Sequence, residues 1–523
     1  MGTKHIMDGI TRLGKDTIAQ VGMRDLAWKL AYIFILWQIC GYIYNLHFHP
    51  CARYPGPLLC RMSKLPNLYY AWRGTKHLRV QEMHKKYGDV VRLEPAFLSL
   101  ITPNAVQEIY GAGSKFRKGL WYARAPMEKQ ALVNIASATD LTVHSRKKRL
   151  MSHAFSDAAL RSYENTVLAK IQLLCRQLPD PAAFGGEYKN MARWLAYLTY
   201  DIMGKLTFSH EYNMLTSDDG HFIQPVIDTF QHGQIILGAV PWVEQWGLAP
   251  LLFVNVMSAI GRFQAYVDRQ VSQRIADEEA GRGHDDIFRL LLNHEDKTTG
   301  EKMGFKELSD EAVVLIIAAS DTTATALTAA AYYLARYPDC YARLQREVRT
   351  TFPDGVETIV SGPLLSSCRY LWAAVEEALR MCPGVPGFLV RESPVDAVVD
   401  GHLVPAGTHV GVPGWAMHRR SDLYPDPQVY RPERWLQGSE SDDELRRLRS
   451  AHFPFSRGPR ACIGKKLAYN TLYLTLARLA FLFDMEVREP LPLEFHVKDH
   501  FAAGEKDGPY VKFVPAARGT DGK

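Results

Sequence analysis

A ten-residue segment near the C-terminal end of the chain combines a cysteine, an arginine and two glycines at a spacing suited to a flat ligand. Residues 455–464 read FSRGPRACIG, which places Phe455, Gly458, Arg460, Cys462 and Gly464 just before a helical pattern. Glycines permit a tight turn and a close approach of the backbone to a planar ligand. A cysteine at the start of a helix is stabilised as a thiolate by backbone N–H groups, and the nearby arginine can reach an anionic group. The segment therefore predicts a thiolate facing a flat, anionic ligand.

A second reactive group interrupts the long apolar helical pattern of residues 309–336. There the sequence ASDTT places Asp321 and Thr322 between Ser320 and Thr323. A carboxylate and hydroxyls within a buried helix must be satisfied by partners or by water. Asp and Thr side chains can also bond to their own backbone, so local back-bonding is the alternative to a catalytic role.

A third group is a predicted ion-paired cluster. Residues 377–380 read EALR, and the i, i+3 spacing puts Glu377 and Arg380 on one helix face. Further along the chain, the sequence YRPERW at 430–435 carries Arg434. An ordinary solvated pair is the alternative for an isolated motif of this kind.

These segments resemble, in order, motifs of the cytochrome P-450 family of heme-thiolate monooxygenases. The resemblance implies that heme b is the cofactor and that Cys462 is the metal ligand, an axial thiolate that favours O–O cleavage. It also implies that Phe455, Arg460 and Gly464 help to bind the heme.

The helical segment is similar to the A-G-x-D-T-T oxygen-activation motif of the family, with Ala319 in place of glycine. The resemblance implies that Thr322 hydrogen-bonds the bound dioxygen and that Asp321 connects the site to solvent protons. This pair would then perform general acid catalysis.

Glu377, Arg380 and Arg434 are implied by the same resemblance to form a structural triad that supports the heme pocket. Tyr430 and Trp435 replace the phenylalanines of the F-x-P-E-R-F motif of the family. We expect these three residues to serve the fold and not the chemistry.

Further heme contacts are implied on two upstream segments. HSRKKRLMSHAFSD at 144–157 is similar to the heme-contacting helix of the family, in which an aromatic residue or histidine precedes an arginine by four residues. Here those residues are His144 and Lys148, and a lysine offers a heme propionate a cation without the bidentate fork of arginine. Arg391 lies where related fungal members place another propionate-binding arginine.

Helical patterns dominate the chain beyond residue 58, and the β-branched runs are short. Because no change in composition divides this region, the sequence predicts one mainly α domain with a small β-sheet portion, an α+β fold over residues 58–523. The cytochrome P-450 resemblance implies the same fold. Helical patterns cover 140–155, 161–178, 192–208, 251–280, 309–336, 339–352, 368–381 and 465–483, and β-branched runs cover 89–101, 395–412 and 485–515.

An apolar segment near the N-terminus predicts a membrane anchor. Residues 30–46 read LAYIFILWQICGYIYNL and carry no charge. We expect a single transmembrane helix at 25–47, long enough for the hydrocarbon core, after an N-terminal tail at 1–24 and before a Pro-rich hinge at 48–57. A cleaved signal peptide is the main alternative, but no small-residue cleavage site follows the run. The flanking basic residues do not decide the orientation.

The composition is that of an ordinary globular chain. Of the 523 residues, 47 % are hydrophobic and 23 % charged, and a formal net charge of +6 is too dilute to indicate a nucleic-acid partner. The eight cysteines show no CxxC pairing, which favours a reducing compartment.

Electrons must come from a separate protein, because the chain has no flavin or nicotinamide fingerprint. We expect an NADPH-cytochrome reductase, so that NADPH acts only indirectly. Its acidic surface would dock on a basic patch formed by Arg146, Lys147, Arg149, Lys465 and Lys466, although solvated helix faces would look the same in sequence.

The substrate is expected to be a lipophilic small molecule. The segments 111–135, 221–253, Val313–Ser320, Pro383–Leu389 and His500–Ala503 should face it, and their side chains are mostly apolar and bulky. Residues 236–253 fit either a surface that dips into the membrane or ordinary core.

The sequence thus predicts a membrane-anchored monooxygenase that inserts one atom of dioxygen into this molecule. We expect a monomer in the endoplasmic reticulum membrane with its catalytic domain in the cytoplasm. Resemblance to fungal microsomal members points to secondary metabolism, on a terpenoid, alkaloid or polyketide. The alternatives are an oxygen-independent heme-thiolate isomerase or dehydratase, which would not need Asp321 and Thr322, and a non-enzymatic heme or electron carrier.

Overall fold

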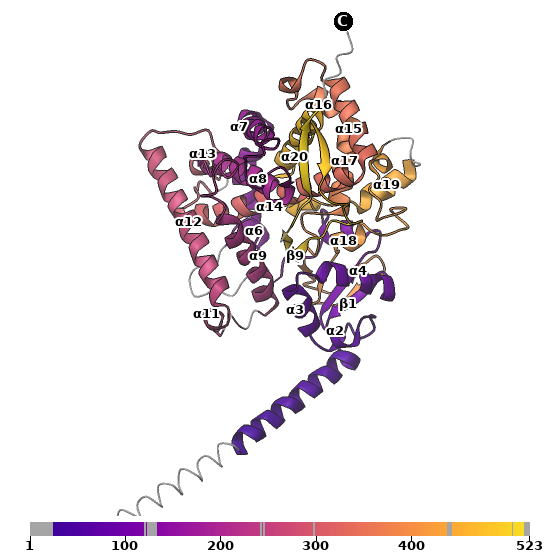
Figure 1. The fold of residues 1–523 in the computed structure, drawn as a ribbon. Helices are drawn as coiled ribbons and strands as arrows, with labels where there is room; N and C mark the ends of the chain where they lie inside the picture. The colour runs from indigo at the N-terminus through magenta and orange to yellow at the C-terminus, as the bar shows by residue number, and fades with distance from the viewer. Residues whose placement is uncertain are drawn as a thin grey trace, which may run out of the picture.

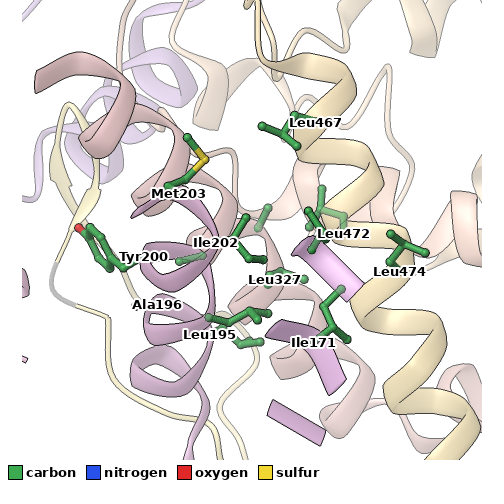
Figure 2. Close-up of a cluster of buried hydrophobic side chains, with 14 of the residues drawn as sticks. Ile171, Leu195, Ala196, Tyr200, Ile202, Met203, Leu327, Leu467, Leu472 and Leu474 are labelled. Carbon is green, nitrogen blue, oxygen red and sulfur yellow. The ribbon is translucent and has the colours of Figure 1, made fainter. Parts of the chain in front are cut away.

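Helix α14 (Phe305–Arg336) crosses the domain and organises the helices around it (Figure 1). Its middle is rich in alanine, which forms helix readily and whose small side chain lets neighbouring helices approach closely. Helices α8 (Met191–Phe208), α17 (Arg369–Met381) and α20 (Lys465–Leu482) pack against it. Figure 2 shows Leu195 of α8, Leu327 of α14 and Leu472 of α20 meeting in this core.

The computed structural model describes residues 25–119, 122, 133–240, 243, 246–296, 299–436, 442–504 and 506–516. Its mainly helical content with small sheets confirms the predicted fold class. The other helices are α2 (Leu58–Met62), α3 (Leu65–Trp72), α4 (Lys76–Tyr87), α5 (Ala105–Tyr110), α6 (Leu141–Ser152), α7 (Asp157–Gln177), α9 (Ile223–Ala239), α11 (Ala249–Leu252), α12 (Val254–Glu279), α13 (Ile287–Asn293), α15 (Pro338–Thr351), α16 (Pro363–Ser367), α18 (Gly414–Met417) and α19 (Asp442–Ala451).

Several helix starts follow from local capping chemistry. The Asp140 side chain accepts hydrogen bonds from the backbone N–H groups of Thr142 and Val143 and so begins α6. Ser156 and Asn190 cap α7 and α8 in the same way. These caps satisfy N–H groups that have no partner within the helix.

The start of α14 differs from the prediction. The helix begins at Phe305, one turn before Ser309, and no side chain caps it. Ser309, Asp310 and Glu311 are buried inside the helix, where they bind other segments: Gln264 donates to Ser309, and the backbone N–H of Ile135 donates to Glu311. Residues typical of a cap serve tertiary contacts here, which the local pattern could not reveal.

The strands form small sheets at the edges of the helical core. The largest has the order β1-β2-β7-β4, with β1 (Val90–Glu94) antiparallel to β2 (Phe97–Leu100), β2 parallel to β7 (His409–Gly411), and β4 (Arg391–Glu392) antiparallel to β7. In its register Val91 is opposite Ser99 and Leu98 is opposite Val410. The others are β3 (Lys189–Asn190), β11 (Tyr510–Pro515) and β8 (Phe483–Val487); β5 (Ala397–Val399) with β6 (His402–Val404); and β9 (Lys498–His500) with β10 (Ala502–Gly504).

The N-terminal apolar segment is a single helix, Asp25–Phe48, none of which is buried against the domain. It projects away from the domain (Figure 1), and its length and hydropathy are those of a membrane span. Helix α14 is also long and apolar enough, but 72 % of its most apolar stretch is buried in the domain, as expected for a core helix. The Pro-rich segment 48–57 lies against the domain: Tyr54 donates to the carbonyl of Leu403, and Pro55 accepts from the N–H of Arg92.

Candidate active site

The backbone of the Cys462 loop requires glycine at position 458. Gly458 has φ +69°, and a Cβ there would collide with the carbonyl oxygen of Tyr110. The N–H of Cys462 donates to the carbonyl of Phe455 at 3.0 Å, which closes the loop just before α20. Burial raises the pKa of the Cys462 thiol, while the N–H of Gly464 and the charges of Lys148 and Lys465 lower it.

A cavity of about 1600 Å³ lies between this loop and α14. Cys462 lies in one wall, and Ala318, Ala319 and Thr322 of α14 lie in another. Ala318 has an exposed side chain although it belongs to a core helix, because it faces the cavity. Phe455 and Gly464 complete the wall beside the cysteine. The space therefore brings the predicted thiolate and the predicted hydroxyl to one chamber with room for a large planar ligand.

Four basic side chains, of which His144 is neutral at neutral pH, converge on the same cavity without an ion-paired carboxylate among the described residues. Lys118, His144, Arg391 and Arg460 all line it, and among the described residues none of them forms an ion pair with an acid. Burial and the charge of Arg391 lower the pKa of Arg460 to about 10, and burial and Arg460 lower that of His144 to about 4. An anionic ligand would relieve this repulsion, so the cluster fits the two propionates of a heme.

Two of these side chains, Arg460 and Lys118, are held by backbone carbonyls of the segment 136–139. Arg460 donates to the carbonyls of Ala138 at 2.6 Å and Thr139 at 2.9 Å, and Lys118 donates to Ala136. Lys118 was not singled out by the sequence motifs. Lys148 donates to the carbonyl of Pro459 at 2.6 Å and is not a wall residue of the cavity, so its contact with a propionate stays a prediction.

Asp321 and Thr322 point to different surroundings although they are neighbours on α14. Thr322 lines the cavity, and its hydroxyl donates to the carbonyl of Ala318 at 2.6 Å, the local back-bond that was the alternative reading. Gly384 lies close to it, and a Cβ there would be 3.0 Å from the Thr322 Cβ. Asp321 is buried behind the wall, where Lys506 Nζ lies 2.8 Å from its Oδ1 and Gln231 donates to its Oδ2 at 3.4 Å.

The predicted triad comes together in the core. Arg380 donates to Glu377 through Nη2 at 2.8 Å and Nε at 2.9 Å, and Arg434 Nε donates to the same carboxylate at 2.9 Å. Trp435 Nε1 and the N–H of Arg431 add two more donors. The two arginines and these hydrogen bonds lower the pKa of Glu377 to about 2 against the opposing effect of burial. The alternative of a solvated surface pair is wrong, since all three charged side chains are 0 % exposed.

The basic patch proposed for reductase docking is wrong for Lys147, and the other two basic residues of its α6 part are ion-paired. Lys147 is buried and ion-paired with Glu307 at 2.8 Å and Glu311 at 2.9 Å. Arg146 also pairs with Glu307, and Arg149 pairs with Asp296. These basic residues bind α6 to the first turns of α14 and to Asp296 before it, so acids far away in sequence neutralise them. Of the proposed set, Arg149, Lys465 and Lys466 stay exposed, and Lys466 is ion-paired with Asp157 at 2.6 Å.

Parts of every segment expected to face the substrate line the cavity. They include Phe230, Ile235, Val313, Ile317, Leu389 and His500. Within segments 111–135 and 221–253, residues 120–121, 123–132, 241–242 and 244–245 lie outside the described residues.

This arrangement is that of a heme-thiolate enzyme: a cysteine at a helix start, a large cavity lined by basic side chains, and a hydroxyl in another wall of the same cavity. The sequence pattern of the cytochrome P-450 family matches residues 54–506, and the chain belongs to this family. The family implies heme-thiolate iron as cofactor, with electrons supplied by a reductase.

Related proteins show the same class of activity. The chain is 36 % identical over 489 residues to the cytochrome P-450 monooxygenase atnE of Emericella nidulans, covering 90 % of this chain and 93 % of the relative. It is 36 % identical over 478 residues to poxM of Penicillium oxalicum, with 90 % and 91 % covered. A shorter relative, ataY of Aspergillus terreus, is 63 % identical over 210 residues, which are 40 % of this chain and 91 % of the relative. The protein is a monooxygenase of this family, which confirms the predicted enzyme class and goes against the isomerase and carrier alternatives.

Proposed function

We propose that the protein oxidises a lipophilic intermediate of fungal secondary metabolism in the chamber between Cys462 and Thr322. The observation that carries the proposal is this cavity, whose wall is mostly apolar apart from the cation cluster. Bound heme supplies the activation of dioxygen with electrons that a reductase delivers. The relatives from Emericella, Penicillium and Aspergillus support a fungal setting.

The side chains take separate tasks in this proposal. Cys462 binds the heme iron as a thiolate, and His144, Arg391 and Arg460 orient the propionates. Apolar side chains of α9 and α14 exclude bulk water from the reacting carbon, which prevents wasteful release of reduced oxygen. The Thr322 hydroxyl would hold a proton at the cavity wall, and the Asp321 carboxylate behind the wall would orient the water that resupplies this proton.

We further propose that one end of the domain rests on the membrane that holds the Asp25–Phe48 helix. Exposed apolar side chains gather on α2, α3 and the region of α11, which lie at the end of the domain from which this helix leaves (Figure 1). Leu251 is 75 % exposed and Trp246 72 %. Such a patch is costly in water and stable at a lipid surface. The membrane is that of the endoplasmic reticulum, the domain is cytoplasmic, and the chain works as a monomer.

Heavy-isotope labelling tests the function. A fungal host lacking its own copy, or yeast that carries a fungal reductase, would express the chain and receive terpenoid, polyketide and alkaloid intermediates under ¹⁸O₂. One labelled oxygen in a product made only when the chain is present would support the proposal. Unlabelled product, or product formed equally under nitrogen, would contradict it.

A further inference from the structure

Asp321 is held by side chains from two distant parts of the chain. Lys506, after β10, lies 2.8 Å from Asp321 Oδ1, and the two side chains are 3 % and 5 % exposed. Gln231, on α9, donates to Oδ2 at 3.4 Å. Because an ionised carboxylate only accepts hydrogen bonds, the amide of Gln231 must turn its NH₂ group toward Asp321. Each carboxylate oxygen therefore has its own donor.

Three partners hold the Lys506 ammonium in this position. It also donates to the hydroxyl of Thr325 at 2.9 Å and to the carbonyl of Ala503 at 2.7 Å. The Thr325 hydroxyl in turn donates to the backbone carbonyl of Asp321 at 2.9 Å. A buried ammonium is stable only when paired and fully hydrogen-bonded, and here all three of its protons are engaged. Lys506 thus sets both the charge and the direction of the Asp321 carboxylate.

Gln231 connects the acid to the chamber. It lies in the cavity wall, is 6 % exposed, and its Oε1 has no hydrogen-bond partner among the described side chains and backbone. A buried acceptor of this kind is satisfied when a water or a hydroxyl donates to it. The amide therefore offers an ordered site between Asp321 and the chamber that Thr322 lines.

We propose that Lys506 and Gln231 are positioning residues for Asp321. Lys506 fixes the carboxylate behind the wall, and Gln231 orders the water that joins it to Thr322. The inference rests on the proposed roles of Asp321 and Thr322.

The test uses the purified holoenzyme with a reductase, and its probes are NADPH and dioxygen, so that no substrate needs to be known. The variants are Lys506→Met, Lys506→Arg and Gln231→Leu. Matched controls are Lys189→Met, since Lys189 is a buried lysine bonded to carbonyls of Asp180, Ala183 and Phe184, and Gln345→Leu, since Gln345 is a buried amide on α15. The measurements are hydrogen peroxide released per NADPH and the solvent isotope effect in D₂O.

Lys506→Met and Gln231→Leu should raise hydrogen peroxide per NADPH toward the limit of one, because less of the bound oxygen receives the protons that take it on to water, and should change the isotope effect. Lys506→Arg should restore most of the wild-type ratio, and both controls should keep it. Thermal unfolding of Lys506→Met, Asp321→Asn and the double variant should be non-additive, which requires no turnover.

A wild-type ratio and isotope effect in Gln231→Leu and in Lys506→Met would overturn the positioning roles. If Lys506→Met fails to fold, Gln231→Leu and Lys506→Arg decide the matter by the same measurements. A wild-type enzyme that consumes no NADPH with its reductase would instead refute the proposed function.

Discussion

Glu377→Gln is the sharpest test of the buried triad, because the change removes one charge and keeps the shape of the side chain. The carboxylate accepts hydrogen bonds from Arg380 and Arg434, both fully buried. An amide would leave these two cations without a counter-ion in the core. Breaking a buried pair by removing one partner costs about 3–5 kcal/mol.

The depressed pKa of Glu377 gives a second value for the free energy that its ion pairs contribute, and the two values are similar. The pKa falls from 4.5 to about 2 in the folded protein. At about 1.4 kcal/mol per pH unit this corresponds to roughly 3 kcal/mol of stability. Because the folded pKa is depressed, this contribution is complete above about pH 4.5 and is lost as the pH falls toward 2. Both figures are a large part of the 5–15 kcal/mol that holds a typical domain folded.

The assay compares urea unfolding and heme content of wild type, Glu377→Gln and a control at neutral pH. Glu489→Gln is a suitable control, since Glu489 is 76 % exposed and lies 3.5 Å from Arg488, which is 51 % exposed, and a surface pair is worth about 0–1 kcal/mol. Glu377→Gln should lose heme and unfold at lower urea, and its acid unfolding should lack the component between pH 4.5 and 2. A heme-loaded Glu377→Gln protein as stable as the control would refute the reasoning.

Three further changes should separate cofactor binding, membrane binding and proton delivery. Cys462→Ala should abolish the strongly red-shifted Soret band of the reduced, carbon-monoxide-bound protein, because no other described cysteine lines the cavity, and a retained band would disprove the ligand assignment. Deleting residues 1–47 should release most of the protein from membranes with heme intact, as measured by flotation; unchanged tight binding would make the exposed patch around Leu251 the principal anchor. Thr322→Ala should keep the fold and heme but lower product per NADPH, since losing a positioned proton donor costs about 10²–10⁴-fold in the assisted step, and wild-type coupling would mean that protons arrive by another route.

Residues whose role depends on their immediate neighbours could be predicted from the sequence. The Cys462 loop needs glycines where the backbone turns and a helix just after the thiolate, and these requirements lie within ten residues. The long apolar pattern of α14 likewise predicts a core helix, and the structure differs only in where it begins. The i, i+3 spacing placed Glu377 beside Arg380 because both belong to one helix.

Residues whose role depends on distant partners could not be predicted in this way. Lys147 reads as an exposed lysine on a basic helix, and only the fold brings Glu307 and Glu311 to it. Lys506 meets Asp321 across 185 positions of the chain, with no motif to mark it. A sequence pattern shows the charges of a segment and the periodicity of its apolar residues, but it does not show which charges will form ion pairs in the tertiary structure.

Helix α14 is both a helix of the core and a wall of the cavity, and both roles depend on its tertiary contacts. Its apolar stretch would pass for a membrane span, and burial in the domain makes it the wall of a chamber instead. At that wall, Thr322 faces the chamber and its neighbour Asp321 lies behind the wall, since successive helix residues differ in direction by about 100°. A carboxylate turned into the protein must have partners there, and Lys506 and Gln231 come from the segment after β10 and from α9, which close the chamber on other sides. The acid that we propose for proton delivery is therefore held by side chains from elements around the chamber, so changes in these elements should alter proton delivery as well as substrate choice.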